Sequence, residues 1–177
     1  MKILFKIILL NYLLSIYGCS FSTEDGRKVP FARLYSLMGV LEWSENDDTP
    51  FYGKYEGEIE NDKPSGQGEI TYPNGSKYIG MWYMGKRNGK GTFTSSDGGE
   101  FVGQWLNGKR NGQGTSVSID GDKYIGEWKN DKSEGAGQMI WHGVGDLVGE
   151  FKNDLPNGHC EQTYVNGTKY IGEVVDG

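Results

Sequence analysis

One short signature recurs along the chain at a constant spacing. Each copy has a large apolar residue, then any residue, a glycine, any residue and a second large residue. The six copies begin at Tyr55, Tyr78, Phe101, Tyr124, Leu147 and Tyr170, so each starts 23 residues after the one before. A fixed period in this range predicts a stack of similar supersecondary units. Stacked repeats build extended surfaces, which favours binding over catalysis.

The repeat that begins at Tyr78 predicts two short β-strands and two tight turns. Because alternate side chains of a strand point to opposite faces, Tyr78, Gly80 and Trp82 are expected on one face. We expect the first turn at residues 85–88, and a return strand from residue 89. Asp97-Gly98 then signals a tight hairpin turn. Equivalent pairs stand at Asn74-Gly75, Asp120-Gly121 and Asn166-Gly167.

These patterns predict an all-β fold, an elongated single-layer antiparallel meander of successive β-hairpins with an open edge at the C-terminal strand. A helical repeat is excluded, because each glycine inside a helix costs about 1 kcal/mol and every repeat has several. The chain holds 29 glycines, and 13% of its residues are aromatic. An aromatic ring on one strand can cover a bare glycine on the next, which predicts columns of stacked rings. One column is expected at Tyr78, Phe101, Tyr124 and Tyr170, and a second at Trp82, Trp105, Trp128 and Phe151.

The pattern Tyr-x-Gly-x-Trp-x-x-Gly-x-x-x-Gly-x-Gly, closed by Asp-Gly or Asn-Gly, resembles the MORN repeat, and residues 101–121 are the closest copy. The resemblance covers residues 55–177, as repeats 55–77, 78–100, 101–123, 124–146 and 147–169 and a half repeat 170–177. It implies a twisted, groove-like sheet that acts as a scaffold, a self-association module or a phospholipid binder. The chain departs from the pattern at Leu147, at Ile59, Phe151 and Val174 in place of tryptophan, and at Cys160 in place of glycine.

The first 18 residues have the basic start and short apolar core of a secretory signal peptide. Residues 16–19 resemble the lipobox of bacterial lipoproteins, which implies lipidation of Cys19 and a membrane-anchored lipoprotein of the cell envelope. A secreted or periplasmic protein, an uncleaved anchor and a cytosolic protein are the alternatives. A disulfide between Cys19 and Cys160 is a further option in an oxidising compartment.

Between the signal and the repeats, residues 19–30 are polar and are expected to form a flexible tether. Residues 31–54 are predicted to form a degenerate leading strand or cap. Within them, residues 39–43 (Gly-Val-Leu-Glu-Trp) match the second half of a repeat, as in residues 68–72.

Charge and motifs exclude several classes of function. The net charge is −6, and residues 55–177 carry the whole acidic excess, so no basic stripe for nucleic acid is present. The two histidines, His142 and His159, are isolated, and Cys160 beside His159 points to the opposite face of its strand. Gly-x-Gly doublets precede no helix, so they indicate no phosphate loop. The sequence therefore predicts no enzyme, no catalytic or metal site and no cofactor.

Two sets of residues are candidates for binding. The candidate interaction surface is aromatic: Tyr78, Trp82, Phe101, Trp105, Tyr124 and Trp128. The candidate contacts for anionic lipid lie in the predicted basic turns: Lys86, Arg87, Lys109 and Arg110.

Together these features predict a non-enzymatic repeat scaffold, anchored to a membrane by its acyl group, that presents its sheet to a protein partner of unknown identity. The alternatives are a module that binds phospholipid or another envelope component, and a cytosolic antitoxin-like inhibitor. Self-association through the edge strand that begins at Tyr170 is also expected.

Overall fold

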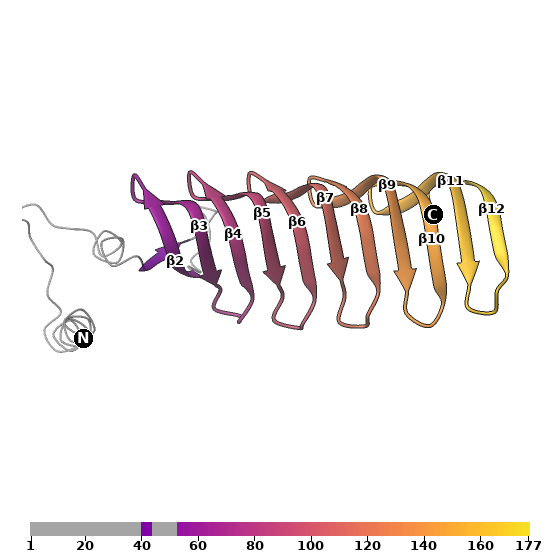
Figure 1. The fold of residues 1–177 in the computed structure, drawn as a ribbon, viewed down its shortest axis with the longest axis horizontal. Coiled ribbons are helices and arrows are strands. Elements are labelled where there is room, and N and C mark those ends of the chain that lie inside the picture. The colour runs from indigo at the N-terminus through magenta and orange to yellow at the C-terminus, as the bar shows by residue number, and fades with distance from the viewer. Residues whose placement is uncertain (1–39, 44–52) are drawn as a thin grey trace, which may run out of the picture.

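The computed structural model describes residues 40–43 and 53–177. This part of the chain forms one antiparallel sheet of 12 strands that lie side by side in sequence order (Figure 1). The all-β meander is therefore confirmed. The strands are β1 Val40–Trp43, β2 Gly53–Glu60, β3 Lys63–Thr71, β4 Lys77–Tyr83, β5 Lys86–Thr94, β6 Glu100–Leu106, β7 Lys109–Val117, β8 Lys123–Lys129, β9 Lys132–Trp141, β10 Gly145–Lys152, β11 Leu155–Tyr164 and β12 Lys169–Val174.

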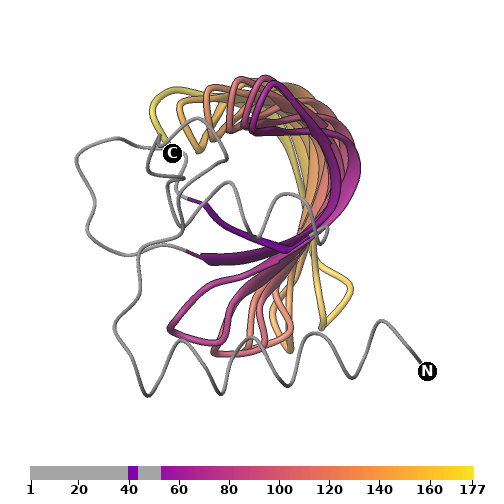
Figure 2. The ribbon, with the colours of Figure 1, turned by 90° about the vertical axis from the view of Figure 1, so that its left-hand side faces the viewer.

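Seen along its long axis, the sheet curls into an open arc, and the successive hairpins lie one behind another (Figure 2). The turns inside repeats line one long side of the sheet, and the turns between repeats line the other (Figure 1). Equivalent residues therefore form rows that run the length of the sheet. The signal peptide, Cys19, the tether and residues 31–39 and 44–52 of the predicted cap lie outside the described residues.

The short strand β1 pairs with β2 so that Leu41 lies opposite Tyr55. In the same way Ile70 of β3 lies opposite Tyr78 of β4. The backbone of β1 thus occupies the place of a repeat's second strand and continues the sheet beyond the first complete repeat.

The turn inside each repeat is a two-residue turn with positive φ at both positions, as at Asn107 (φ 51°) and Gly108 (φ 83°). This is the geometry of a type I′ turn, which matches the twist of the flanking strands and favours Asn-Gly. The predicted turn at residues 85–88 is wrong, because the turn lies at Met84-Gly85 and β5 already begins at Lys86. Equivalent pairs are Asn61-Asp62, Asn130-Asp131 and Asn153-Asp154.

Replacing Met84 by asparagine is expected to stabilise the protein by about 0.5–1 kcal/mol. Met84 is held at φ 49°, a left-handed conformation that asparagine tolerates better than methionine. Asparagine also occupies the equivalent positions 107, 130 and 153. The free energy of unfolding in denaturant measures the gain, and Asn107→Met should lose a similar amount. An unchanged unfolding midpoint for Met84→Asn would contradict the assignment of strain to this turn.

Candidate interaction surface

The six aromatic residues of the candidate surface lie on one face of the sheet, here called the aromatic face, and form its core. Their exposed fractions are only 0–6%. Trp105 meets Tyr78 edge-on at 5.2 Å between ring centroids and Phe101 at 5.3 Å. The rings of the two predicted columns therefore interleave, together with Tyr55, in one continuous series that ends at Phe151, in the T-shaped arrangement that aromatic pairs favour. Tyr170, which was predicted to continue the first column, lies outside this series and is 44% exposed. Because they are covered by each other, these rings serve packing in the sheet, and exposed residues must supply any contact with a partner.

The rings also cover the glycines of the repeat, as the sequence predicts. A Cβ atom built on Gly91 would lie 2.5 Å from Cε2 of Tyr78, and one built on Gly80 would lie 2.5 Å from Cα of Gly91. Gly80 and Gly91 face each other across β4 and β5. One tyrosine ring thus lies over two facing glycines, and no side chain fits beneath it. Phe101 and Tyr124 cover Gly114 and Gly137 in the same way.

The polar ends of the buried rings are satisfied by backbone carbonyls. A register shift between Gly80 and Trp82 marks a β-bulge, and the Tyr78 hydroxyl donates to the carbonyl of Met81 inside it at 3.0 Å. Trp105 Nε1 donates to the carbonyl of Gly91 at 3.3 Å. These bonds fix the ring positions, since a buried donor without a partner would cost free energy.

Stability is expected to fall as the pH rises from about 10 to about 12. Burial, with a smaller contribution from Glu58 at Tyr55 and from Glu127 at Tyr124, raises the pKa of both phenols to about 12. Unfolded tyrosine ionises near pH 10, so the unfolded state loses protons first and is favoured above that pH. Denaturant unfolding at about pH 9 and about pH 11 measures the loss. A Tyr55→Phe/Tyr124→Phe variant should lose less between these pH values, and an equal loss would contradict the prediction.

The fifth repeat replaces the ring and the glycine together. Leu147 stands at the tyrosine position, and Cys160 stands where the other repeats have glycine. Both side chains are buried, and a Cβ built on Gly149 would lie 2.5 Å from Sγ of Cys160. The thiol therefore covers the glycine that a tyrosine ring covers elsewhere. Cys160 is a free thiol, while its predicted disulfide partner Cys19 lies outside the described residues.

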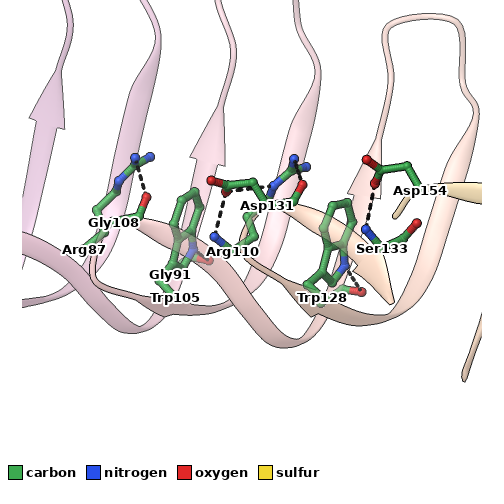
Figure 3. A network of polar contacts seen from close by, with 10 residues as sticks. Arg87, Gly91, Trp105, Gly108, Arg110, Trp128, Asp131, Ser133 and Asp154 are labelled. Carbon is green, nitrogen blue, oxygen red and sulfur yellow. Dashed lines mark hydrogen bonds and ion pairs between the residues drawn. The ribbon is translucent and has the colours of Figure 1, made fainter. Parts of the chain in front are cut away.

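The two arginines of the predicted basic turns lie on the aromatic face, in strands β5 and β7. The guanidinium of Arg87 lies 4.3 Å from the ring centroid of Trp105, and that of Arg110 lies 4.1 Å from the centroid of Trp128. Figure 3 shows both side chains reaching to the turn of the next repeat. Arg87 donates to the carbonyl of Gly108 at 2.8 Å. Arg110 donates to the carbonyl of Asp131 at 2.6 Å and pairs with its carboxylate at 3.4 Å.

These contacts separate the four candidate lipid residues into two groups. Arg87 and Arg110 are partly buried and join neighbouring repeats, whereas Lys86 and Lys109 are exposed. Burial lowers the pKa of Arg110, and Asp131 opposes this effect. The exposed lysines belong to a row at the same position of four repeats: Lys63, Lys86, Lys109 and Lys132.

The face opposite the aromatic face carries an exposed apolar row that the sequence pattern did not lead us to expect. Its exposed fractions run from 38% at Ile125 to 62% at Ile171. We call it the aliphatic row, and it consists of Ile79, Val102, Ile125, Val148 and Ile171. Its members alternate in the sheet with polar residues, which are Thr92, Thr115, Gln138 and Glu161. The sequence feature that could have predicted this row is a β-branched residue directly after the first aromatic position in five successive repeats.

Comparison with known families supports this arrangement. A family model described as MORN repeat matches residues 55–77, 78–100, 101–123, 124–143 and 148–169, which is more than half of the chain. The chain belongs to the MORN-repeat family. No match is found among curated proteins. MORN repeats are in general modules for interaction with proteins or membranes, and MORN-repeat proteins are generally non-enzymatic scaffolds.

His159 and Cys160, adjacent in the described part of the chain, differ in exposure and lie on opposite faces of their strand. No group of three or more His, Cys, Asp and Glu side chains in this part of the chain could hold a metal ion. His159 is exposed and faces Glu173 at 3.6 Å, while the adjacent Cys160 is buried on the aromatic face. No helix in the described part is long and apolar enough to cross a membrane.

Proposed function

We propose that this MORN-repeat protein is a non-enzymatic scaffold that binds a partner protein along the aliphatic row. The observation that carries the proposal is the exposure of five β-branched residues at one position of consecutive repeats. Equivalent positions recur every second strand, so neighbouring members lie about 10 Å apart on a rigid sheet. Exposed apolar surface bordered by polar residues is typical of interaction sites, and here apolar residues recur in a row among polar ones.

The test places a charge in the middle of the row. In a Val102→Glu/Ile125→Glu variant we expect capture of a partner from the source cells to fall at least tenfold. The fold should persist, because glutamate already occupies the equivalent position at Glu56. Val165→Glu is the matched control, since Val165 is 72% exposed in the turn between β11 and β12, away from the row. Equal capture by the row variant and the wild type would reject the proposal.

We also propose that Cys19 anchors the protein to a membrane. Acylation of Cys19 after removal of residues 1–18 would attach the repeat sheet to a membrane through the polar tether. Labelling with a radioactive fatty acid should mark the wild-type protein, and Cys19→Ser should abolish both the label and sedimentation with membranes. A soluble wild-type protein without label would favour the secreted or cytosolic alternatives.

A second candidate function, binding to anionic phospholipid, is favoured by the lysine row. Four exposed lysines at one repeat position could contact head groups about 10 Å apart. The net charge of −6 opposes this attraction over the molecule as a whole. Flotation with phosphatidylglycerol vesicles tests it, with glutamine at Lys63, Lys86, Lys109 and Lys132 as the variant. Lysine-dependent flotation that survives the aliphatic-row substitutions would make lipid, and not protein, the partner.

A further inference from the structure

One position on the aromatic face breaks the pattern of the repeats. In the second strand of each repeat, the residue opposite the first aromatic position is Ile70, Phe93, Ser116, Met139 or Gln162. Ser116 is by far the smallest of these side chains, and its neighbours Phe93 and Met139 are large. A hollow of about 420 Å³ lies over Ser116, between Phe93 and Met139 of the flanking repeats.

The walls of this hollow are mainly apolar. Phe93 and Met139 flank it, and Phe101 and Tyr124 from strands β6 and β8 line it as well. Phe101 and Tyr124 are buried in the core, so these two walls are rigid. A volume of this size falls within the usual range of small-molecule sites, which runs from about 300 to about 1,000 Å³.

The charged groups around the hollow differ in sign and in whether they are already paired. Arg110 lines it, but its guanidinium is already paired with Asp131 and stacked on Trp128. Two carboxylates line it toward the turns between repeats, Asp97 and Asp122. The Glu100 side chain points to the opposite face, because its neighbour Phe101 lies on the aromatic face. Asp97 receives a hydrogen bond from the backbone N–H of Gly99, and Asp122 receives one from the backbone N–H of His142. The uncompensated charge at this end of the hollow is therefore negative.

We propose that the hollow at Ser116 binds a small organic cation with an apolar body, a primary alkylammonium or arylalkylammonium. The apolar body would lie against Phe93, Phe101 and Met139, where a larger residue at position 116 would otherwise pack. Its ammonium group would face the carboxylates at the turns, with Asp97 as the exposed counter-ion. This site is on the face opposite the aliphatic row, so it is independent of the proposed function and can be tested separately.

The experiment titrates the full chain with 2-phenylethylammonium and follows backbone amide shifts by NMR. Saturable shifts are expected at residues 116–119 and at Met139. The matched probe 3-phenylpropionate has a similar shape and the opposite charge, and should bind at least tenfold more weakly. Ser116→Met fills the hollow as Met139 fills its own repeat, and should abolish the shifts. Gln162→Met makes the equivalent change two repeats away and should leave binding unchanged.

Asp97→Asn supplies a second variant at an exposed position that does not depend on repacking of the core. It should weaken 2-phenylethylammonium binding several-fold and leave 3-phenylpropionate unaffected or bound slightly more tightly. The proposal is overturned by an absence of saturable shifts, by equal binding of the two probes, or by unchanged binding in a folded Ser116→Met variant.

Discussion

Replacing Gly91 by alanine should destabilise the protein by about 3 kcal/mol or more, because overpacking a rigid core is costly. The added Cβ would lie 2.5 Å from Cε2 and Cζ of Tyr78. The ring cannot move aside, since Trp82 and Trp105 pack against it and its hydroxyl is bonded to the carbonyl of Met81. Gly91 does not have a left-handed φ, so the cost is steric. Denaturant unfolding of both proteins measures the difference.

Gly98→Ala is the matched control for this substitution. Gly98 has φ +96°, and a Cβ built on it would have no atom within 4 Å, so alanine there costs only backbone strain of about 1 kcal/mol. A second test copies the fifth repeat, where Leu147 accompanies Cys160. Adding Tyr78→Leu to Gly91→Ala should recover part of the lost stability. If Gly98→Ala were as damaging as Gly91→Ala, steric covering by the ring would not be the reason for the glycine.

Much of the fold could be predicted from the period alone. A repeat of 23 residues without insertion fixes the strand order, because each hairpin must contact the one before it. The covering of the strand glycines by aromatic rings was also predictable. Tyr78, Gly80 and Trp82 share one face of their strand, and a glycine weakens a strand unless another group covers it. The equivalence of residues 39–43 with residues 68–72 likewise follows from matching side chains.

The position of the first turn was harder to predict, because two signals compete in residues 84–89. The Gly85 to Gly89 stretch is polar and rich in glycine, which is typical of a loop. The turn is formed by two residues with positive φ. The sequence Asn107-Gly108 is typical of such a turn, whereas Met84-Gly85 is not, because methionine seldom adopts this conformation. The shift by two residues moves Arg87 from a solvated turn into a strand on the aromatic face.

The candidate site was predictable only in part. The spacing in the sequence predicts columns of aromatic rings, but it does not predict how close the two columns lie to each other. Two columns of rings at the same spacing could stand apart and leave exposed ring surface. In the structure the β-bulge before Trp82 and its equivalents allows each tryptophan to lie between two tyrosine-type rings. The rings are thereby buried, and the exposed apolar row lies on the opposite face of the sheet. The exposed apolar residues of this sheet therefore lie between the signature positions.

Replacing Trp105 by alanine should cost about 3–5 kcal/mol, the usual range for a buried aromatic residue. Its ring contacts Tyr78, Phe101 and the guanidinium of Arg87, and its N–H is bonded to Gly91. The loss should be cooperative over several repeats, because a single hairpin is marginal on its own. Trp105→Phe should cost less, about 1–2 kcal/mol, since Phe151 occupies the equivalent position of the fifth repeat.

A double-mutant cycle separates the stacked arginine from the ring's packing. Arg87→Gln alone should lose the cation–π contact and the bond to the carbonyl of Gly108. In a Trp105→Phe background its cost should shrink by about 0.5–1 kcal/mol, because phenylalanine holds a cation more weakly than tryptophan. The same cycle at Arg110 and Trp128 should give a similar coupling, since the contact with Asp131 contributes to the cost of Arg110→Gln in both backgrounds and cancels. Strictly additive losses at both pairs would mean that neither arginine is stabilised by its tryptophan. The guanidinium would then link successive repeats without help from the indole beneath it.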